Sequence, residues 1–293
     1  MSHIAEEIAT EPACWLAAAD RARAVGAQLP RTGERVAVVG CGTSYNVASS
    51  YAVLREGRGG GFTDAFPASE VRWRRAYDRV LLISRSGTTS EVLAVARSLP
   101  EGTPAVALTA EPRSPLAEAV EHTIVLDFAH ERSVVQTRFA TSVLALLRAH
   151  LGEDLAGAVA DGRAALEAPL DEDWMRAQRF TFLGTGWVVG LAGEAALKLR
   201  ESALCWTESY PAMELRHGPI SVVDAGTLVW SLDRAPEGLG ADVTATGAIF
   251  VDASLDPLAE LVRIHRLALA LAEARGLDPD HPRHLSFSVV LDD

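Results

Sequence analysis

The sequence predicts an α/β protein built on parallel sheets, and three features of the chain support that prediction. Short apolar segments alternate with helical patterns along most of the 293 residues. Three of the apolar segments end at turns rich in glycine, serine or threonine, beginning at Gly40, Ser84 and Gly184. The chain is also long and apolar enough, at 48% hydrophobic residues, to bury one large or two ordinary cores. Strands that alternate with helices in this way form parallel sheets covered on both faces.

The first half of the chain is predicted to contain four strands. A helix is expected over residues 3–28, with a break at Pro12 near its start. The expected strands are short runs of apolar and β-branched residues, at 35–39, 80–84, 104–109 and 122–128. The expected helices follow them: one runs from the turn at 40–44 through Leu54, and the others lie at 90–99, 115–120 and 133–151.

The second half repeats the pattern in a shorter form. A mostly helical connection is expected over 152–173, then strands at 179–183, 227–232 and 248–251, and a final helix at 258–275. Strand, Gly-Thr loop and helix recur at 36–54 and 180–203, which indicates an internal repeat. The last two strands are separated by little more than the roughly 12 residues of a minimal parallel crossover. We therefore expect an N-terminal helix plus first domain at 1–152, and a linker helix plus trimmed second domain at 153–293.

Composition excludes several functional classes. A formal net charge of −12 disfavours binding to nucleic acid, which requires a basic face. The acidic start does not resemble a signal peptide, and no apolar run approaches the ~18 residues of a membrane span. The three cysteines form no CxxC pair, which predicts a reduced, cytoplasmic protein without a disulfide framework or zinc site. An anionic ligand would have to be bound locally, by backbone N–H groups and hydroxyls.

The turn after the second expected strand is a candidate anion site. Ser84, Ser86 and Thr89 surround one glycine immediately before a helix, where an open α/β sheet binds its ligands. Capping of the helix is the structural alternative, although one hydroxyl would be enough for a cap. The chain has no Gly-Lys-Ser/Thr motif, and the third glycine of a GxGxxG motif is replaced by Tyr45. A small phosphorylated ligand is therefore favoured over a nucleotide.

The only lysine of the chain lies on a predicted helix between two acids. Glu194, Lys198 and Glu201 fall on one helical face, whereas the remaining basic residues are all arginines. Ordinary salt bridges, worth ~0.3–0.5 kcal/mol each, are the structural alternative. His217 follows in a loop bounded by proline and glycine, and histidine is the residue type best suited to acid–base catalysis by its intrinsic pKa. A solvated loop histidine is the alternative for that residue.

Several segments resemble the sugar isomerase (SIS) domain family. The similarity lies at 40–44, 84–89, 131–137, 193–202 and 208–219, and extends from Glu7 to Arg283. The pattern is most similar to the tandem-SIS isomerase half of glucosamine-6-phosphate synthase and to aminosugar-phosphate isomerases and deaminases. The resemblance implies two flavodoxin-like, three-layer αβα domains with parallel sheets. It also implies a homodimer in which each active site receives a residue from the neighbouring subunit.

The resemblance also implies roles for particular residues. The phosphate-binding positions match Ser84, Arg85, Ser86 and Thr89. Contacts to phosphate and sugar hydroxyls match Cys41, Gly42, Thr43 and Ser44, and the pocket lining matches Val134 and Gln136. Glu201 matches the carboxylate that moves a proton between carbons 1 and 2, with Glu194 and Lys198 beside it. His217 matches the ring-opening histidine donated across the dimer.

Two positions depart from the synthase pattern. Phe287 stands where the synthase has a lysine that forms a Schiff base with the ketose, and Arg85 replaces a glutamine. The expected function is therefore a phosphosugar aldose–ketose isomerase on a hexose or aminohexose 6-phosphate, with deamination as a variant and no metal or cofactor. The main alternative is a sugar-phosphate-binding regulatory protein without catalysis. A thiol enzyme using Cys41 is a weaker alternative, because no second cysteine is evidently placed to resolve it.

Overall fold

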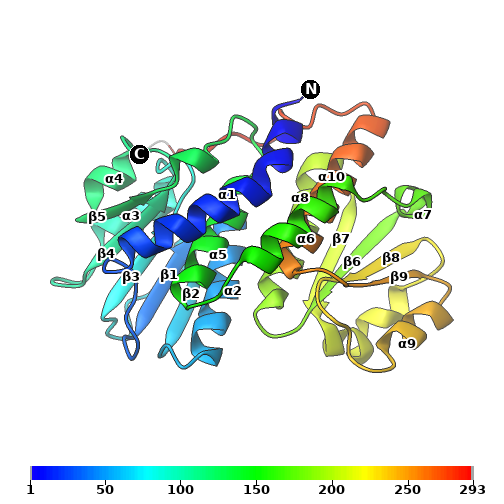
Figure 1. Ribbon diagram of the computed structural model, residues 1–293, viewed down its shortest axis with the longest axis horizontal. Coiled ribbons are helices and arrows are strands. Elements are labelled where there is room, and N and C mark those ends of the chain that lie inside the picture. The colour runs from blue at the N-terminus through cyan, green and yellow to red at the C-terminus, as the bar shows by residue number, and fades with distance from the viewer. Residues whose placement is uncertain (1, 292–293) are drawn as a thin grey trace. The chain divides into compact units, whose positions relative to one another are not determined.

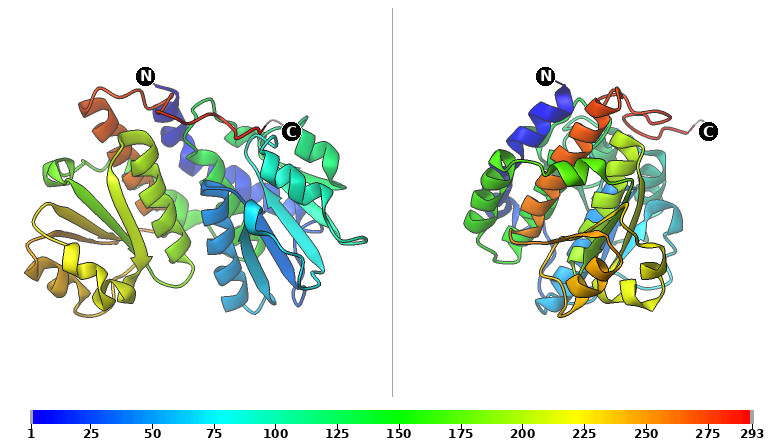
Figure 2. Two further views of the ribbon diagram at one scale, coloured as in Figure 1. Left: turned by 180° about the vertical axis from the view of Figure 1, so that it is seen from behind. Right: turned by 90° about the vertical axis from the view of Figure 1, so that its right-hand side faces the viewer.

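The computed structural model describes residues 2–291 as two compact units (Figures 1 and 2). The five-stranded unit contains residues 13–155 and also the last described residues, 286–291. The four-stranded unit contains residues 2–12 and 156–285. Both sheets are parallel throughout, so the predicted α/β class with parallel sheets is confirmed.

The five-stranded sheet has the order β2-β1-β3-β4-β5. Its strands, in chain order, are β1 (Val36–Gly40), β2 (Thr63–Pro67), β3 (Arg79–Ile83), β4 (Ala105–Thr109) and β5 (His122–Val125). The three central strands are buried along their whole length, as the apolar runs predicted. Val39 pairs with Leu82, so β1 and β3 end at the same edge of the sheet. The turns that follow these two strands are therefore neighbours.

Helices cover both faces of this sheet (Figure 1). On one face lie α2 (Thr43–Gly57) and α5 (Arg138–His150); on the other lie α3 (Ser90–Arg97) and α4 (Pro115–Ala119). Alternate strand residues such as Val39 and Leu82 share an apolar core with Val92 of α3 and Leu116 of α4. Two short 3-10 turns, Ala68–Glu70 and Asp127–Ala129, complete the connections.

The four-stranded sheet has the order β7-β6-β8-β9. Its strands are β6 (Arg179–Gly184), β7 (Trp206–Pro211), β8 (Thr227–Ser231) and β9 (Ile249–Asp252). One face is covered by α8 (Val188–Ala203) and α10 (Pro257–Ala274), with α6 (Ala156–Glu167) and α7 (Glu172–Arg176) beside α10. The other face is covered by α9 (Leu239–Ala245) and the 3-10 turns η3 (Ala212–His217) and η4 (Pro219–Val222).

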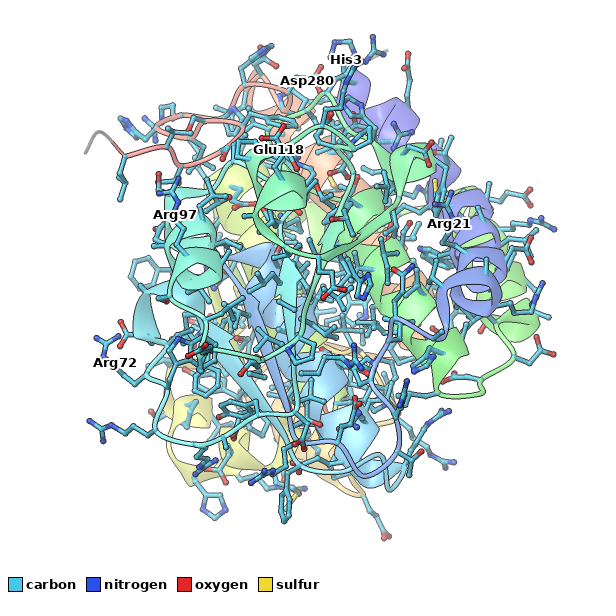
Figure 3. All side chains as sticks on the ribbon, turned by 90° about the vertical axis from the view of Figure 1, so that its left-hand side faces the viewer. His3, Arg21, Arg72, Arg97, Glu118 and Asp280 are labelled. Atoms are coloured by element: carbon cyan, nitrogen blue, oxygen red, sulfur yellow. The ribbon has the colours of Figure 1, made fainter. Side chains whose placement is uncertain are left out.

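The first helix differs from the expectation at Pro12. Helix α1 (His3–Val25) continues through this proline, so the predicted break is wrong. A proline removes one helical hydrogen bond, but the buried side chains of Ile8, Glu11 and Trp15 hold the helix on both sides of it. The start of α1 is capped by the carboxylate of Asp280, which accepts the backbone N–H groups of His3 and Ile4 at 2.8 and 2.9 Å (Figure 3).

The helix expected over 133–151 begins only at Arg138. The buried carboxylate of Glu131 accepts the N–H groups of Thr137 at 2.6 Å and Phe139 at 3.2 Å. These bonds satisfy donors that have no partner within the first turn of the helix. Residues 133–137 therefore form a loop folded around one acid instead of a helical turn.

The two strand–loop–helix segments of the predicted repeat share a local geometry. β1 ends at Gly40 and β6 at Gly184, each directly before a helix. A Cβ atom added to Gly40 would lie 2.6 Å from the carbonyl carbon of Ser44, and one added to Gly184 would lie 2.5 Å from that of Val188. Both helices approach the strand end closely enough to require glycine there.

Candidate functional site

A small polar pocket lies in the five-stranded unit, where β1 and β3 end. Its lining residues come from the two turns, the loop before α5 and the C-terminal segment: Cys41, Ser44, Ile83, Ser84, Arg85, Ser86, Thr89, Val92, Gln136 and Phe287. Its volume is about 30 Å³. Seven of the ten residues expected to bind substrate line it. Of the other three, Gly42 and Thr43 lie at the start of α2, and Val134 contributes its carbonyl to Arg85.

The hydroxyls of the turn after β3 bond mainly to one another and to the turn's own backbone. The Oγ of Ser84 accepts the N–H of Gly87 at 3.2 Å and lies 3.3 Å from Oγ1 of Thr89. The Oγ of Ser86 accepts the N–H and hydroxyl of Thr88 at 3.2 and 2.9 Å. Thr89 is the N-cap residue of α3, but its side chain makes no capping hydrogen bond. Helix capping therefore does not explain why this residue carries a hydroxyl.

Arg85 carries the positive charge nearest the pocket, and its charge is paired. Its guanidinium lies 3.2 Å from the carboxylate of Glu131, and both side chains are buried. The Nε of Arg85 and Oε1 of Gln136 are buried without a hydrogen-bond partner. Buried polar atoms are nearly always satisfied in native proteins, so these two atoms are available to a polar ligand or to water.

Cys41 contributes a thiol rather than a thiolate. Burial raises the pKa of this side chain above its ordinary value, and the nearby charge of Glu91 raises it further. A nucleophilic cysteine requires the opposite shift. The geometry therefore disfavours the thiol-enzyme alternative, and Cys41 serves as pocket lining.

A second cluster lies on α8 of the four-stranded unit. Nζ of Lys198 lies 2.6 Å from Oε2 of Glu201 and 3.3 Å from Oε1 of Glu194. Lys198 and Glu194 are 1% exposed, whereas the side chain of Glu201 is 20% exposed. Burial by itself lowers the pKa of Lys198, but the two carboxylates more than offset this, and the pKa lies above its ordinary value. Lys198 is thus a permanent cation that holds one buried acid and one accessible acid.

His217 is the last residue of η3 in the same unit, and it is exposed. Within residues 2–291, no hydrogen bond or ion pair joins it to Glu201. The structure therefore brings together the three predicted residues of α8 and, separately, those of the polar pocket. It does not bring His217 to the acid of its own chain.

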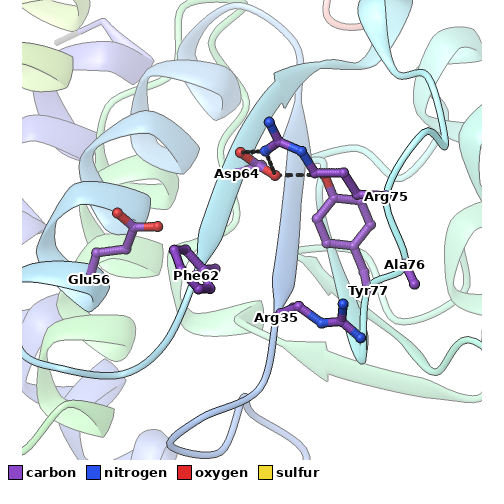
Figure 4. Close-up of a pocket in the computed structure, with 7 residues that line it drawn as sticks. All are labelled: Arg35, Glu56, Phe62, Asp64, Arg75, Ala76 and Tyr77. Atoms are coloured by element: carbon purple, nitrogen blue, oxygen red, sulfur yellow. Dashed lines mark hydrogen bonds and ion pairs between the residues drawn. The ribbon is translucent and has the colours of Figure 1, made fainter.

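A larger hollow of about 470 Å³ lies at the opposite edge of the five-stranded sheet (Figure 4). Asp64 receives two bonds from Arg75, at 2.9 and 2.8 Å, and one from the hydroxyl of Tyr77 at 2.7 Å. The second arginine of this hollow, Arg35, is paired with Asp78. Both cations are neutralised, and the hollow lies where the strands begin rather than where they end. It is therefore a poor candidate for an anion site.

Residues 2–291 contain neither a cluster suited to bind a metal ion nor a helix suited to span a membrane. No group of three or more histidine, cysteine, aspartate or glutamate side chains is placed to hold a metal ion. No helix in the same range is sufficiently long and apolar to cross a bilayer.

Two parts of the pocket are not predicted from the sequence. Glu131 belongs to a predicted motif, but its carboxylate both orders the loop before α5 and pairs with Arg85. The C-terminal segment contributes Phe287 to the lining. The replacement of lysine by phenylalanine at this position was the only signal in the sequence.

Comparison with known proteins places a SIS domain at residues 31–150. The chain is 29% identical over 301 residues to the glutamine–fructose-6-phosphate aminotransferase (isomerizing) of Sulfolobus acidocaldarius, covering 88% of this chain and 50% of that protein. It is 27% identical to the enzyme of the same name from Bacillus subtilis, covering 88% and 52%. The chain thus spans about half the length of the curated relatives it matches, and it is homologous to their isomerase domain.

Solved structures extend the similarity over almost the entire chain. The glucosamine-6-phosphate deaminase of Thermotoga maritima is 26% identical with a TM-score of 0.80, covering 99% of this chain and 100% of that one. The tagatose-6-phosphate ketose/aldose isomerase of Escherichia coli is 20% identical with a TM-score of 0.78, covering 97% of both chains. The latter similarity concerns the fold alone.

Proposed function

We propose, from the SIS domain at residues 31–150, that this chain is a phosphosugar aldose–ketose isomerase. Its substrate is a hexose or aminohexose 6-phosphate, and deamination accompanies isomerisation when carbon 2 carries an amino group. The main support is the polar pocket, which gathers hydroxyls from the turns after two neighbouring parallel strands. The relatives named as a glucosamine-6-phosphate deaminase and as an isomerizing fructose-6-phosphate aminotransferase support the same interpretation.

The phosphate is proposed to bind the turn after β3. Ser84, Ser86 and Thr89 supply hydroxyls, and the α3 terminus supplies backbone N–H groups that favour an anion. Cys41, Gly42, Thr43 and Ser44 are assigned to the sugar side of the pocket, together with Val134 and Gln136. This mode of binding needs no positive overall charge, and the chain, at −12, has none.

Proton transfer between carbons 1 and 2 is assigned to Glu201. The reaction needs a carboxylate that is partly accessible and held in place, and the pairing of Glu201 with Lys198 at 2.6 Å supports that assignment. Lys198 also offers positive charge near the enolate that forms during transfer. Glu194 fixes the ammonium from its other side.

Ring opening is assigned to His217, donated by the second subunit of a homodimer. The exposure of His217 and its lack of contact with Glu201 of its own chain agree with such an arrangement. We further assign residues 1–152 and 153–293 to tandem flavodoxin-like, three-layer SIS domains, apart from residues 2–12 and 286–291, each of which belongs to the other unit. We assign the protein to the cytoplasm.

Deamination would use the same proton transfer. A proton leaves carbon 2 and is returned to carbon 1, and the amine on carbon 2 becomes an imine. Water hydrolyses this imine to a ketone and ammonia. No lysine of the enzyme takes part, which agrees with Phe287 at the position where a lysine would be needed for covalent capture.

A non-catalytic sugar-phosphate sensor is the second candidate, favoured by the same Phe287 and by the second unit, whose sheet has four strands instead of five. The two functions separate in a simple experiment. The protein is incubated with glucosamine 6-phosphate, galactosamine 6-phosphate, or fructose 6-phosphate with and without ammonia. Release of ammonia or conversion between aldose and ketose supports the enzyme. A ligand-induced rise in melting temperature without turnover supports the sensor. If neither turnover nor a rise in melting temperature is observed, both the enzyme and the sensor proposals are refuted.

A further inference from the structure

The guanidinium of Arg85 has almost no hydrogen-bonding capacity left for a ligand. Its Nη1 donates to Oε2 of Glu131 at 3.2 Å and to the carbonyl of Ser133 at 3.0 Å. Its Nη2 donates to the carbonyls of Val134 at 3.0 Å and Phe287 at 2.8 Å. A guanidinium has five N–H donors, four of them on the two Nη atoms. Only the Nε–H of Arg85 therefore remains without a partner.

Arg85 makes two interactions with the C-terminal strap, which we define as residues 286–291. The ring of Phe287 stacks on Arg85, with 3.8 Å between Cζ and the ring centroid, and its carbonyl accepts from Nη2 of the same side chain. One buried arginine thus binds both the backbone and the side chain of a single residue. The contact combines a charge-assisted hydrogen bond with a cation–π interaction.

The strap also occupies the start of α3, where a phosphate would bind. The carbonyl of Val289 accepts the N–H of Ser90, the first residue of α3, at 3.1 Å. The N–H of Leu291 returns a bond to Oγ of Ser90 at 2.9 Å, and Oγ of Ser288 lies 2.9 Å from Oγ1 of Thr88. Figure 2 shows this segment ending beside the helices of the five-stranded unit. The strap thus uses donors of the turn that an anion would use.

The cavity beneath the strap has room for the centres of water-sized probes over only about 30 Å³, which is enough for about two water molecules. A phosphate group carrying a sugar does not fit in that space. Phe287 lines the cavity, so displacement of the strap would enlarge it.

We propose that Arg85 is a positioning residue that fastens the C-terminal strap over the polar pocket, rather than a ligand of the phosphate. Sugar phosphate then binds only to the form in which the strap is displaced. This inference rests on the proposed function, since it assumes that the pocket takes a phosphate. It reassigns Arg85, which the family pattern had placed among the phosphate-binding residues.

If Arg85 fastens the strap, its substitution should tighten the binding of phosphate. If Arg85 is a phosphate ligand, the same substitution should weaken that binding. If the strap is mostly closed, the apparent affinity is reduced by the fraction of molecules that are open. Phe287→Ala, which leaves Arg85 and Glu131 intact, opens the strap and tightens the binding of glucosamine 6-phosphate and inorganic phosphate, by about tenfold if the wild type is open one-tenth of the time. Arg85→Gln does the same, although it removes a positive charge.

The experiment compares wild type, Phe287→Ala and Arg85→Gln as full-length chains by calorimetry and by stopped-flow binding. Phe62→Ala is the matched control, because it removes an exposed phenylalanine near the opposite edge of the same sheet. Amide exchange at Ser90 and Leu291, measured by NMR, reports strap opening without any ligand. It should accelerate in Phe287→Ala and remain unchanged in the control.

Each outcome decides between the hypotheses. Faster amide exchange in Phe287→Ala, together with tighter and faster binding of phosphate, supports the proposal that the strap closes the pocket. Equal or weaker binding in Phe287→Ala, when wild type binds phosphate, overturns the inference and leaves the proposed function intact. Weaker binding in a folded Arg85→Gln, judged by its circular dichroism, restores Arg85 to the phosphate ligands. If the strap opens and no variant binds phosphate or sugar phosphate, the proposed function is refuted. The proposal that the strap controls anion binding is then refuted as well.

Discussion

Replacing Lys198 by methionine tests whether the charged cluster on α8 is a buried, interdependent unit. The substitution keeps the length of the side chain and removes the cation that faces Glu194 at 3.3 Å and Glu201 at 2.6 Å. Lys198 and Glu194 are 1% exposed, so solvent cannot replace the lost ammonium. Breaking a buried ion pair by removing one partner costs about 3–5 kcal/mol. We expect a loss of that size in the free energy of unfolding, measured by urea denaturation near neutral pH.

The chain contains a matched control for this substitution. Arg176 on α7 also pairs with two acids of its own helix, Glu172 and Asp173, but its side chain is 68% exposed. Exposed pairs contribute at most about 1 kcal/mol, so Arg176→Met should change the unfolding free energy by less than that. A double variant, Lys198→Met with Glu194→Gln, should recover part of the loss, because it also removes a buried charge. Equal losses in Lys198→Met and Arg176→Met would refute the reasoning.

Three further predictions concern the chemistry. Glu201→Gln should lower kcat by about 10²–10⁴-fold while the Kd for glucosamine 6-phosphate stays nearly constant, and a parallel loss of binding in calorimetry would count against a proton-transfer role. Mixing inactive Glu201→Gln and His217→Ala proteins should restore turnover through subunit exchange, and a mixture that stays inactive although mixed dimers form would contradict donation of His217 across a dimer. Because burial and Glu91 raise the pKa of Cys41, its alkylation by iodoacetamide should still be accelerating above about pH 8.5, where free cysteine is half ionised; a plateau at that pH would show an unshifted thiol.

The central strands could be predicted because they have no polar face. β1, β3 and β4 are buried on both sides, and their apolar runs stand out from the surrounding sequence. The edge strands β2 and β7 were missed for the converse reason. They are only partly buried, and polar residues such as Asp64 and Glu208 interrupt their apolar runs. A short strand that contains polar residues and ends in a proline is difficult to distinguish from a loop when its neighbours are unknown.

The polar pocket could be anticipated because it depends on local rules. Hydroxyls and glycine between a buried strand and a helix mark the binding edge of a parallel sheet, and register then brings two such turns together. The role of Arg85 could not be anticipated, because it depends on Glu131 and Phe287, which lie 46 and 202 residues away in the chain. Contacts between residues so far apart in the chain are visible only in the folded structure. The strap is also irregular, so no sequence periodicity predicts its position.

The most direct test of the central claim is deuterium uptake in D₂O. Glucosamine 6-phosphate, galactosamine 6-phosphate and fructose 6-phosphate are each incubated with wild type and with Glu201→Gln, and the products are examined by NMR and mass spectrometry. Proton transfer by Glu201 predicts that wild type places solvent deuterium on carbon 1 or carbon 2 of at least one of these sugars and that Glu201→Gln does not. Binding of a sugar phosphate without any uptake by wild type, or equal uptake by both proteins, would contradict it.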